Sequence, residues 1–334
     1  SEQINNQGRT RNTHYSYDDE NRVTEVTCDE DNRIIAYTYD AIGRVATRAA
    51  NSMQTSYLTT YQYLAPENGD SIQTTPLVQS ITQNGQNFSY TYDNVGNITS
   101  VTRNGLTTTY EYDSLGQLTR VNDPHAGKST MYLYDCGGNM TGYLSAPYTL
   151  APTLEGVNET VFYTYGDSNW KDKVTAIGGK AITYDAIGNP LTYDGWTFTW
   201  KAGRMLASMV KTGTNAQFTY DHNGLRIKKV VNGVTTNYTL NGKNVVHMTQ
   251  GSHDLHFFYD AQGKPGMVTY NDVDYFYVYN LQGDVVALID ANGTQVVEYG
   301  YDAWGNPISK TGSLATTIGT LNPFRYRGYT YLFY

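Results

Sequence analysis

Pairs of tyrosines separated by one residue recur along the chain, and several of these pairs are followed by an Asp and, three residues later, a Gly. One complete copy runs from Tyr37 to Gly43 (Tyr-Thr-Tyr-Asp-Ala-Ile-Gly) and another from Tyr90 to Gly96 (Tyr-Thr-Tyr-Asp-Asn-Val-Gly). Side chains alternate between the two faces of a β-strand, so both rings of a pair lie on the same face. The pattern predicts a strand that ends at the second tyrosine.

The residues after each tyrosine pair predict a tight turn. An Asp at the start of a turn accepts a hydrogen bond from the backbone N–H two residues on, and a Gly suits the left-handed position that closes the loop. The chain then returns in segments such as Arg44-Val45 and Asn97-Ile98. Each unit is therefore predicted to be a β-hairpin. A lone hairpin is marginal in water, whereas hairpins that pair edge to edge stabilise one another.

The hairpin unit repeats with a period of about 20 residues. The second tyrosines are 22 residues apart from Tyr17 to Tyr39 and 20 residues apart from Tyr92 to Tyr112. This period is too short for most helical repeats and fits two short strands with two turns. The residues assigned to the structural motif are Tyr17, Asp18, Tyr39, Asp40, Gly43, Tyr92, Asp93, Gly96, Tyr112, Asp113, Gly116, Tyr134, Asp135, Tyr184, Asp185, Gly188, Tyr220, Asp221, Tyr259, Asp260, Tyr279, Tyr301, Asp302 and Gly305.

Residues 1–334 are predicted to form one all-β array of these hairpins, joined into a long antiparallel sheet. The motif weakens at Trp196–Met205 and at Tyr238–Lys243, but the period of about 20 residues continues through both. Two stretches depart from the period, roughly 51–80 and 145–160, and both contain Pro. We interpret them as insertions or long turns.

Tyrosine supplies most of the bulky side chains. The chain has 32 Tyr but only 9 Phe, its hydrophobic residues make up 39% and its charged residues only 16%. Both fractions lie below the usual values of about 45–50% and about 25%. A buried tyrosine still needs a partner for its hydroxyl, so this composition predicts thin layers with broad wet surfaces.

Charge and hydropathy exclude several classes of function. The net charge of −8 and the pI of about 5.2 argue against binding to nucleic acid or anionic membranes. No apolar run reaches the roughly 18–20 residues of a membrane-spanning helix. The first residues lack the charged, apolar and cleavage regions of a signal peptide. Two cysteines, Cys28 and Cys136, are too few for a disulfide framework, and we expect two thiols.

Candidate catalytic and metal-binding residues are few. His253 and His256 are three residues apart, so they point to opposite faces of the predicted strand, and a zinc site needs three or four ligands. The acidic segment Cys28–Asn32 lacks the spacing of a calcium loop. The motif Asp residues recur periodically, which favours turn-capping over catalysis. The sequence therefore predicts no catalytic residue, no metal site and no cofactor.

These repeats resemble the YD-repeat, or Rhs-repeat, family. The resemblance covers nearly the whole chain, and residues 299–329 (Tyr299–Pro307 and Asn322–Tyr329) look like the start of the Rhs-associated core module. The family includes bacterial Rhs and wall-associated toxins, the C component of insecticidal Tc complexes, and teneurins. The resemblance implies a β-sheet that spirals into a hollow shell around a C-terminal toxic domain, in proteins that are secreted or at the cell surface.

The sequence departs from the family after Tyr329, because the Asp-Pro-x-Gly segment of the self-cleaving site does not follow. Neither autoproteolysis nor toxicity is carried over, and we expect a non-catalytic shell segment. Its partners would be the remainder of its parent polypeptide, the enclosed cargo, or a second copy paired along an exposed sheet edge. The alternative is a module that binds carbohydrate or protein through exposed rings, with Trp170, Trp196, Trp200 and Trp304 as the candidate platform.

Overall fold

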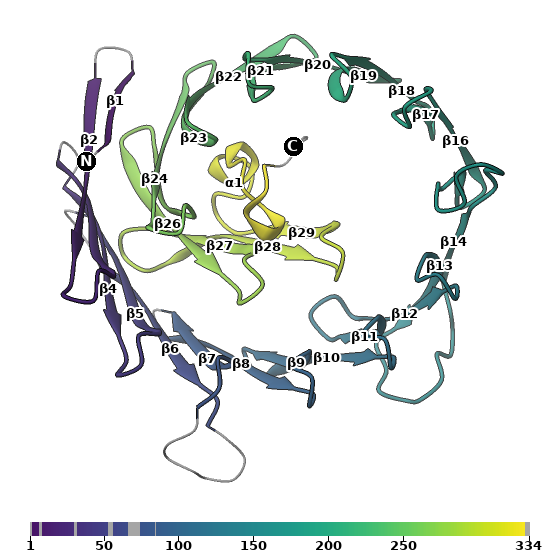
Figure 1. Ribbon diagram of the computed structural model, residues 1–334, viewed down its shortest axis with the longest axis horizontal. Coiled ribbons are helices and arrows are strands. Elements are labelled where there is room, and N and C mark those ends of the chain that lie inside the picture. The colour runs from purple at the N-terminus through teal and green to yellow at the C-terminus, as the bar shows by residue number, and fades with distance from the viewer. Residues whose placement is uncertain are drawn as a thin grey trace. The chain divides into compact units, whose positions relative to one another are not determined.

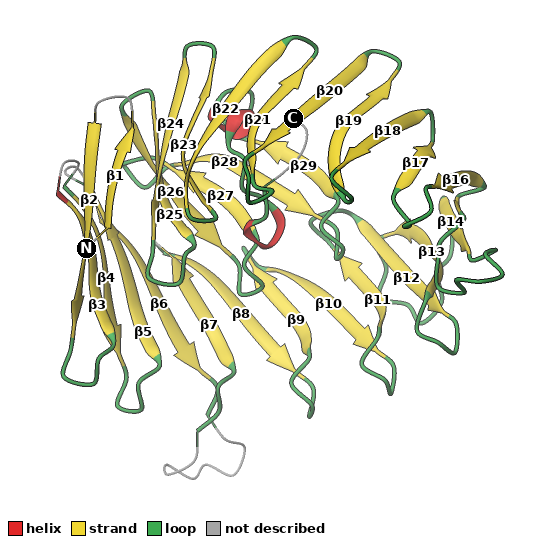
Figure 2. Ribbon diagram, turned by 45° about the horizontal axis from the view of Figure 1, so that its top comes forward, coloured by secondary structure: helices red, strands yellow, loops and turns green. Residues whose placement is uncertain are grey.

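The computed structural model describes residues 2–6, 9–29, 32–52, 56–65, 74–83 and 85–330, and these residues form short antiparallel strands joined by turns (Figures 1 and 2). The predicted all-β fold of tandem hairpins is confirmed. Two short helical elements lie near residue 320: one turn of α-helix, α1 (Ile318–Leu321), and one 3-10 turn, η2 (Tyr326–Gly328). The strands are β1 (Glu2–Asn6), β2 (Arg9–Tyr17), β3 (Val23–Cys28), β4 (Arg33–Tyr39), β5 (Val45–Asn51), β6 (Ser56–Tyr63), β7 (Val78–Gln83), β8 (Gln86–Tyr92), β9 (Ile98–Arg103), β10 (Leu106–Tyr112), β11 (Leu118–Asp123), β12 (Lys128–Tyr134), β13 (Met140–Pro147), β14 (Glu159–Thr164), β15 (Ala176–Ile177), β16 (Lys180–Tyr184), β17 (Pro190–Tyr193), β18 (Trp196–Lys201), β19 (Met205–Lys211), β20 (Thr214–Tyr220), β21 (Arg226–Val231), β22 (Val234–Asn241), β23 (Asn244–Gln250), β24 (His253–Tyr259), β25 (Pro265–Tyr270), β26 (Val273–Tyr279), β27 (Val285–Ile289), β28 (Gln295–Tyr301) and β29 (Pro307–Thr311).

The chain divides into two compact units. Unit 1 comprises Ser1–Leu106, Asn244–His247 and His253–Tyr334, and unit 2 comprises Thr107–Lys243 and Met248–Ser252. In each unit the strands follow one another as antiparallel hairpins, for example β4 with β5 in unit 1 and β18 with β19 in unit 2. No described helix has the length and apolarity needed to cross a membrane.

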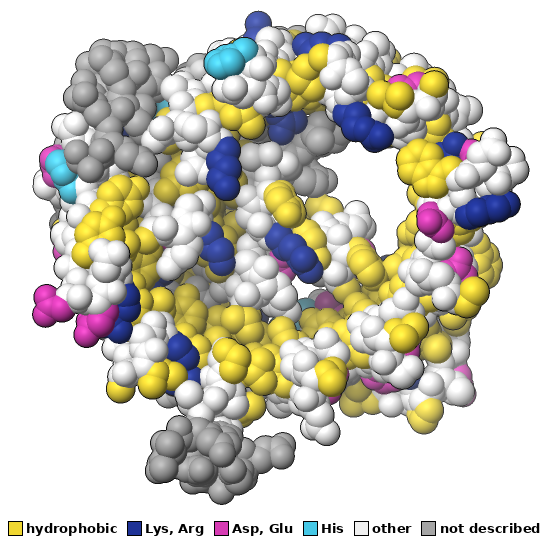
Figure 3. All heavy atoms as spheres, in the orientation of Figure 1, with side chains coloured by type: hydrophobic (Ala, Val, Ile, Leu, Met, Phe, Trp, Pro, Cys, Tyr) yellow, Lys and Arg dark blue, Asp and Glu magenta, His cyan; other side chains and the backbone are white. Residues whose placement is uncertain are grey.

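Unit 1 contains two runs of strands whose faces pack together. Side chains of β3–β8 and of β24–β27 share one buried cluster, and Figure 3 shows apolar side chains gathered over these strands. The largest contributors that are almost fully buried are Tyr57, Phe88, Phe276, Ile35 and Met267.

The second run of unit 1, β24–β28, is buried on both faces. One face of β26 places Phe276 and Val278 in the shared cluster, while Tyr277 on the other face contacts Phe324 of the C-terminal segment. All five residues of β27 (Val-Val-Ala-Leu-Ile) are buried. The expectation of thin, wet layers is therefore wrong for this run. The unbroken apolar sequence of residues 285–289 was the available signal for a strand covered on both sides.

The C-terminal segment lies on the face of β24–β28 that is turned away from β3–β8. Phe324 makes edge-on contacts with the rings of Phe257, Tyr259 and Tyr277. Buried Arg325 donates to the carbonyl oxygen of Gly319, and this bond is 2.6 Å long. These contacts fix residues 318–325 as a third layer of unit 1.

Several strands of unit 2, among them β14, β18 and β20, alternate in exposure with period two. In β18 the side chains of Trp196, Phe198 and Trp200 are half-buried, and Thr197, Thr199 and Lys201 are exposed. One face of this sheet thus carries the aromatic side chains, as the sequence pattern predicts.

The two stretches that interrupt the period both contain regular strands. β6 lies within residues 51–80 and pairs with β5 and β7, so the departure is confined to the connection 64–77, of which 66–73 lie outside the described residues. In the other stretch β13 continues to Pro147 and β14 begins at Glu159. The connection between them is anchored by buried Arg120, which donates to the carbonyl oxygens of Ala151 (2.7 Å) and Pro152 (3.0 Å).

Candidate functional site: the repeat turn and the polar seam of unit 1

The motif Asp organises the backbone of each turn. The Asp40 Oδ1 atom accepts hydrogen bonds from the N–H groups of Ile42 (3.1 Å) and Arg44 (2.9 Å). Gly43, with φ +86°, donates its N–H to the Asp40 carbonyl oxygen (3.0 Å). The bond from the N–H two residues on is the one that the sequence predicts. The second bond, four residues on, closes the loop and explains why a carboxylate stands here.

The residue after the motif Gly completes the turn with its side chain. The side-chain amide of Asn97 donates to Asp93 Oδ2 (2.9 Å). In another turn, the side chain and the backbone N–H of Asn139 both donate to the carboxylate of Asp135, and these two bonds lower the pKa of Asp135. One copy is reversed. Asn280 occupies the Asp position and donates to Asp284 Oδ2 at 2.6 Å.

The bond from the backbone N–H four residues on recurs in both units. It also appears at Asp290, which the sequence motif does not predict because no Tyr-x-Tyr precedes it. The acceptors of this bond are Asp18, Asp40, Asp93, Asp113, Asp135, Asp185, Asp221, Asp260, Asn280, Asp290 and Asp302.

The second tyrosine of the motif satisfies a carbonyl group of the neighbouring hairpin. The β3–β4 ladder stops at Glu25 and Ala36, and the Tyr39 hydroxyl then donates to the Val23 carbonyl oxygen at 2.7 Å. The register of β4 against β5 shifts between Thr38 and Tyr39, which marks a β-bulge at this end of the hairpin. Phenylalanine could pack in this place but could not donate the hydrogen bond.

The same hydroxyl bond is repeated along the chain, and this regularity was missed because the acceptor is a backbone atom of another hairpin. Trp200 makes the equivalent bond through Nε1 to the Pro190 carbonyl oxygen (2.7 Å). The donor tyrosines are Tyr39, Tyr63, Tyr92, Tyr134, Tyr165, Tyr184, Tyr220, Tyr259, Tyr279 and Tyr301.

The first tyrosine of the motif has a different partner in unit 1. The Tyr37 hydroxyl accepts the N–H of Ala261 at 3.1 Å, and the Tyr90 hydroxyl accepts the N–H of Leu281 at 3.1 Å. Both donors directly follow the Asp or Asn of a turn in the facing run of strands. Burial raises the pKa of Tyr37 above its ordinary value, so its hydroxyl stays protonated. The first tyrosine therefore joins layers, whereas the second joins neighbouring hairpins.

A row of ion pairs joins strands β4, β5 and β9 to the β24–β28 run, and we call it the polar seam: Arg33, Arg48 and Arg103 with Asp274, Asp260 and Glu298. Arg48 Nε lies 3.3 Å from Asp260 Oδ2, and their side chains are only 8% and 4% exposed. Arg33 contacts Asp274 at 3.0 Å, and Arg103 contacts Glu298.

A glycine makes room for the central pair of the polar seam. A Cβ atom at Gly266 would lie 2.7 Å from Arg48 Nη2 and would also collide with Ile35. A larger residue at this position of β25 would therefore displace the guanidinium from Asp260.

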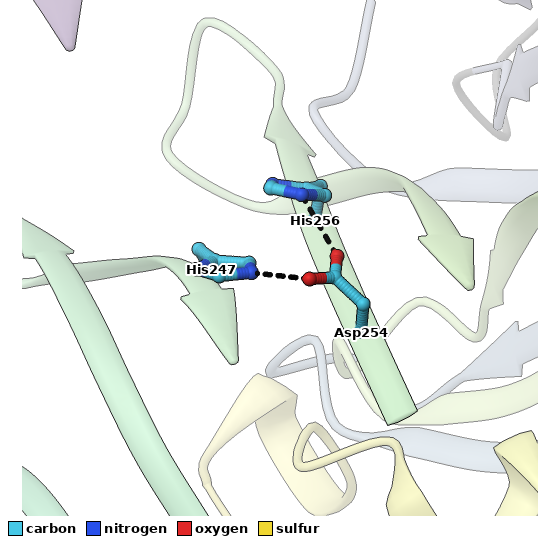
Figure 4. A group of neighbouring side chains, drawn as sticks. All are labelled: His247, Asp254 and His256. Carbon is cyan, nitrogen blue, oxygen red and sulfur yellow. Dashed lines mark hydrogen bonds and ion pairs between the residues drawn. The ribbon is translucent and has the colours of Figure 1, made fainter. Parts of the chain in front are cut away.

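Beside the seam, His247, Asp254 and His256 form a compact group (Figure 4). Asp254 Oδ2 lies 3.0 Å from His247 Nε2, and Asp254 Oδ1 lies 2.8 Å from His256 Nε2. The two rings stack with centroids 4.1 Å apart and planes 13° apart. The sequence spacing makes His253 and His256 the candidate pair, but His253 instead bonds to the Tyr270 hydroxyl through Nδ1 (2.8 Å). His247 was missed because it lies on another strand.

The proton positions in this group do not suit a metal site. The guanidinium of Arg11 contacts His256 Nδ1, and a guanidinium has only donors, so Nδ1 carries the lone pair and Nε2 carries the hydrogen. A metal bound at Nε2 would need the opposite tautomer, with two donors facing each other at Nδ1. Each ring directs its Nε2 atom to a different oxygen of the same carboxylate.

Comparison with known sequences identifies the family. The sequence model described as "Teneurin YD-shell" matches residues 83–319, more than half of the chain, and "RHS Repeat" matches residues 17–52. The chain belongs to the teneurin YD-shell family. The resemblance seen in its tyrosine and Asp repeats is thereby confirmed.

Curated relatives of this YD-shell chain are much longer proteins. It is 34% identical over 207 residues to the tRNA3(Ser)-specific nuclease WapA of Bacillus spizizenii, and 33% identical over 207 residues to the tRNA nuclease WapA of Bacillus subtilis. Each match covers 60% of this chain but only 8% of the relative. The chain therefore spans less than a tenth of the length of the curated relatives that it matches.

Solved structures share the YD-shell fold. The crystal structure of TcdB2-TccC3 superposes with a TM-score of 0.63 at 16% identity, covering 96% of this chain and 20% of that chain. The Tc holotoxin pore of Photorhabdus luminescens superposes with a TM-score of 0.60 at 17% identity, covering 96% of this chain and 19% of that one. At these identities the similarity establishes the fold alone.

The four tryptophans predicted as a platform occupy different places in the YD-shell chain. Trp196 and Trp200 share one face of β18, and Trp170 lies against the turn at Gly188, where a Cβ atom would be 2.6 Å from its ring. These three belong to unit 2, whereas Trp304 lies in the turn after Asp302 in unit 1.

The two cysteines are thiols, Cys28 buried and Cys136 exposed.

Proposed function

We propose that this chain is a wall segment of a YD-repeat shell that encloses a C-terminal cargo of its parent polypeptide and carries out no catalysis itself. The observation that carries the proposal is how the motif carboxylates are used. Each accepts backbone N–H groups of its own turn, as Asp40 does from Ile42 and Arg44, so its lone pairs serve folding and not a substrate. The relatives named WapA are nucleases of which the shared segment is a small part, which supports a role outside the nuclease reaction.

Limited proteolysis of the parent polypeptide tests enclosure. The cargo should resist a protease at all denaturant concentrations that leave the YD-repeat strands folded, and Asp260→Ala should lower the concentration at which both are cut. Cleavage of the cargo while the strands remain folded would refute the proposal. The chain alone, incubated with tRNA, should leave the tRNA intact.

The bacterial relatives also support a location for the parent protein. We place it outside the cytoplasm, secreted or at the cell surface, as the resemblance to wall-associated toxins implies. Fractionation of the producing cells should recover it in the medium or in the wall fraction, and recovery in the cytoplasm alone would contradict this placement.

A second function is favoured by the aromatic row on β18. Trp196 and Phe198 stack with centroids 6.4 Å apart and interplanar angle 24°, and both are half-exposed. Such a row can stack on sugar rings. Titration with oligosaccharides, followed by tryptophan fluorescence, discriminates the two functions: a change in emission that Trp196→Ala removes would favour the binding module over the shell wall.

A further inference from the structure

Strands β2 and β24 of unit 1 meet at a contact that depends on one protonation state. Arg11 of β2 donates to Nδ1 of His256 on β24, and the two residues are 245 positions apart in the sequence. His256 is also faced by His247 of β23, Asp254 of its own strand and Arg33 of β4. Arg33 in turn is paired with Asp274 of β26. His256 is therefore a neutral ring with two cations nearby and one carboxylate bonded to it.

A second proton on His256 has only one place to bind. Nε2 already carries a hydrogen, which it donates to Asp254 Oδ1 (2.8 Å), so a proton from solvent must add to Nδ1. Nδ1 would then lose its lone pair, and its N–H would point at the Arg11 guanidinium. The bond between β2 and β24 is lost at that moment and is replaced by repulsion between two cations.

We propose that Arg11 and His256 form an acid-sensitive latch, in which protonation of His256 releases β2 from β24 and opens one margin of the two-layered unit 1. The biological meaning of such opening rests on the proposed function, since a latch in a shell wall would allow the enclosed cargo to leave in an acidic compartment. The latch itself is a property of unit 1 and can be measured without a cargo.

The direction of the pH response follows from burial and charge. Burial, Arg11 and His247 lower the pKa of His256 to about 3, from an ordinary value of 6.5. The latched state therefore binds fewer protons than the open state at any pH between these two values. Its stability is complete above about pH 6.5 and falls as the pH decreases toward 3. One proton taken up on opening raises the opening constant about tenfold per pH unit in this window.

Hydrogen–deuterium exchange of the whole chain at pH 7.5 and pH 5.0 tests the latch, with rates corrected for the intrinsic pH dependence of exchange. We expect peptides of β2 to gain exchange by at least about tenfold at pH 5.0, while peptides of β26 and β27 stay protected. Protection of β2 that does not change with pH, or simultaneous loss of protection in β27, would overturn the proposal.

Two substitutions separate the latch from general acid sensitivity. His256→Gln keeps an acceptor for Arg11 and a donor for Asp254 but cannot be protonated, so exchange of β2 should become independent of pH. His253→Gln, on the other face of the same strand, should retain the wild-type response. A pH response that survives in His256→Gln refutes the latch. Zn²⁺ at pH 7.5 should not change exchange of β2, and a zinc-dependent gain in protection would contradict the assigned tautomer.

Failure of the latch and failure of the proposed function give different results. If β2 opens in acid but the cargo in the parent polypeptide is cut at neutral pH, the latch stands and the enclosing role fails. If the cargo is protected at neutral pH and β2 exchanges equally at both pH values, the enclosing role stands and the latch fails.

Discussion

The hydroxyl group of Tyr279 donates a 2.8 Å hydrogen bond to the carbonyl oxygen of Pro265, the first residue of the neighbouring strand. The ladder between β25 and β26 ends at Met267 and Phe276, so the Pro265 carbonyl lies beyond the last paired residues. A tyrosine at the end of one hairpin thus satisfies a carbonyl group that the sheet leaves unpaired. This relationship explains why the repeat uses tyrosine and not phenylalanine.

Tyr279→Phe should lower the free energy of unfolding of unit 1 by about 1–3 kcal/mol, because the Pro265 carbonyl would be left buried without a donor. Tyr220→Phe is the matched control, since its hydroxyl makes the same bond to the Leu206 carbonyl oxygen (2.9 Å), and Leu206 is half-buried whereas Pro265 is buried. Water can replace that donor, so the loss should be under about 1 kcal/mol. Urea denaturation of both variants measures the difference, and equal losses would contradict the role of burial.

Changing one polar residue of a motif turn should remove the side-chain hydrogen bond across the turn, and exchanging the two residues should restore it. In Asn97→Asp two carboxylates, which can only accept, face each other where Asn97 Nδ2 now donates to Asp93 Oδ2, so the turn should loosen and amide exchange at residue 97 should rise several-fold. The double variant Asp93→Asn/Asn97→Asp reproduces the natural arrangement of Asn280 and Asp284 and should regain protection. If the double variant exchanges as fast as the single one, side-chain complementarity does not hold this turn.

Removing the central arginine of the polar seam should destabilise unit 1 strongly. Arg48→Met leaves the Asp260 carboxylate buried without its cation, which costs about 3–5 kcal/mol in proteins where such pairs have been broken. Arg22→Met removes an arginine from the more exposed pair with Asp18 and should have a much smaller effect. Thermal unfolding of the two variants makes the comparison. A similar small shift in both would mean that the buried pair contributes no more than a surface pair.

Trp200 should be replaceable by tyrosine better than by phenylalanine. Its Nε1 occupies the place of a tyrosine hydroxyl, with the Pro190 carbonyl as acceptor, so Trp200→Tyr should be more stable than Trp200→Phe by about 0.5–1.5 kcal/mol. Chemical denaturation of the two variants tests this. Equal stability would show that the ring alone matters at this position and would leave the indole free for a ligand.

The sequence was sufficient for the hairpin and its period because their causes are local. Alternation places both rings of Tyr37 and Tyr39 on one face, and the four residues after Asp40 contain every group that closes the turn. The stretch 51–80 was harder to interpret, because Tyr63 lacks a following Asp and yet makes the motif's hydroxyl bond to Val45. The strand that ends at Tyr63 is regular, but the turn after it lacks the motif residues, so the sequence pattern did not predict it.

Residues distant in the sequence decided the rest. Nothing near Tyr37 or Tyr90 indicates that their hydroxyls meet the turns at Ala261 and Leu281, and Arg48 lies more than 200 residues before Asp260. A period-two pattern specifies which face of a strand is apolar, but any other apolar face can cover it. The sequence by itself therefore determined the repeating hairpin, its turn chemistry and its family. Only the tertiary structure decided which hairpins face one another, because that choice depends on burial and ion pairs between strands that are brought together by folding.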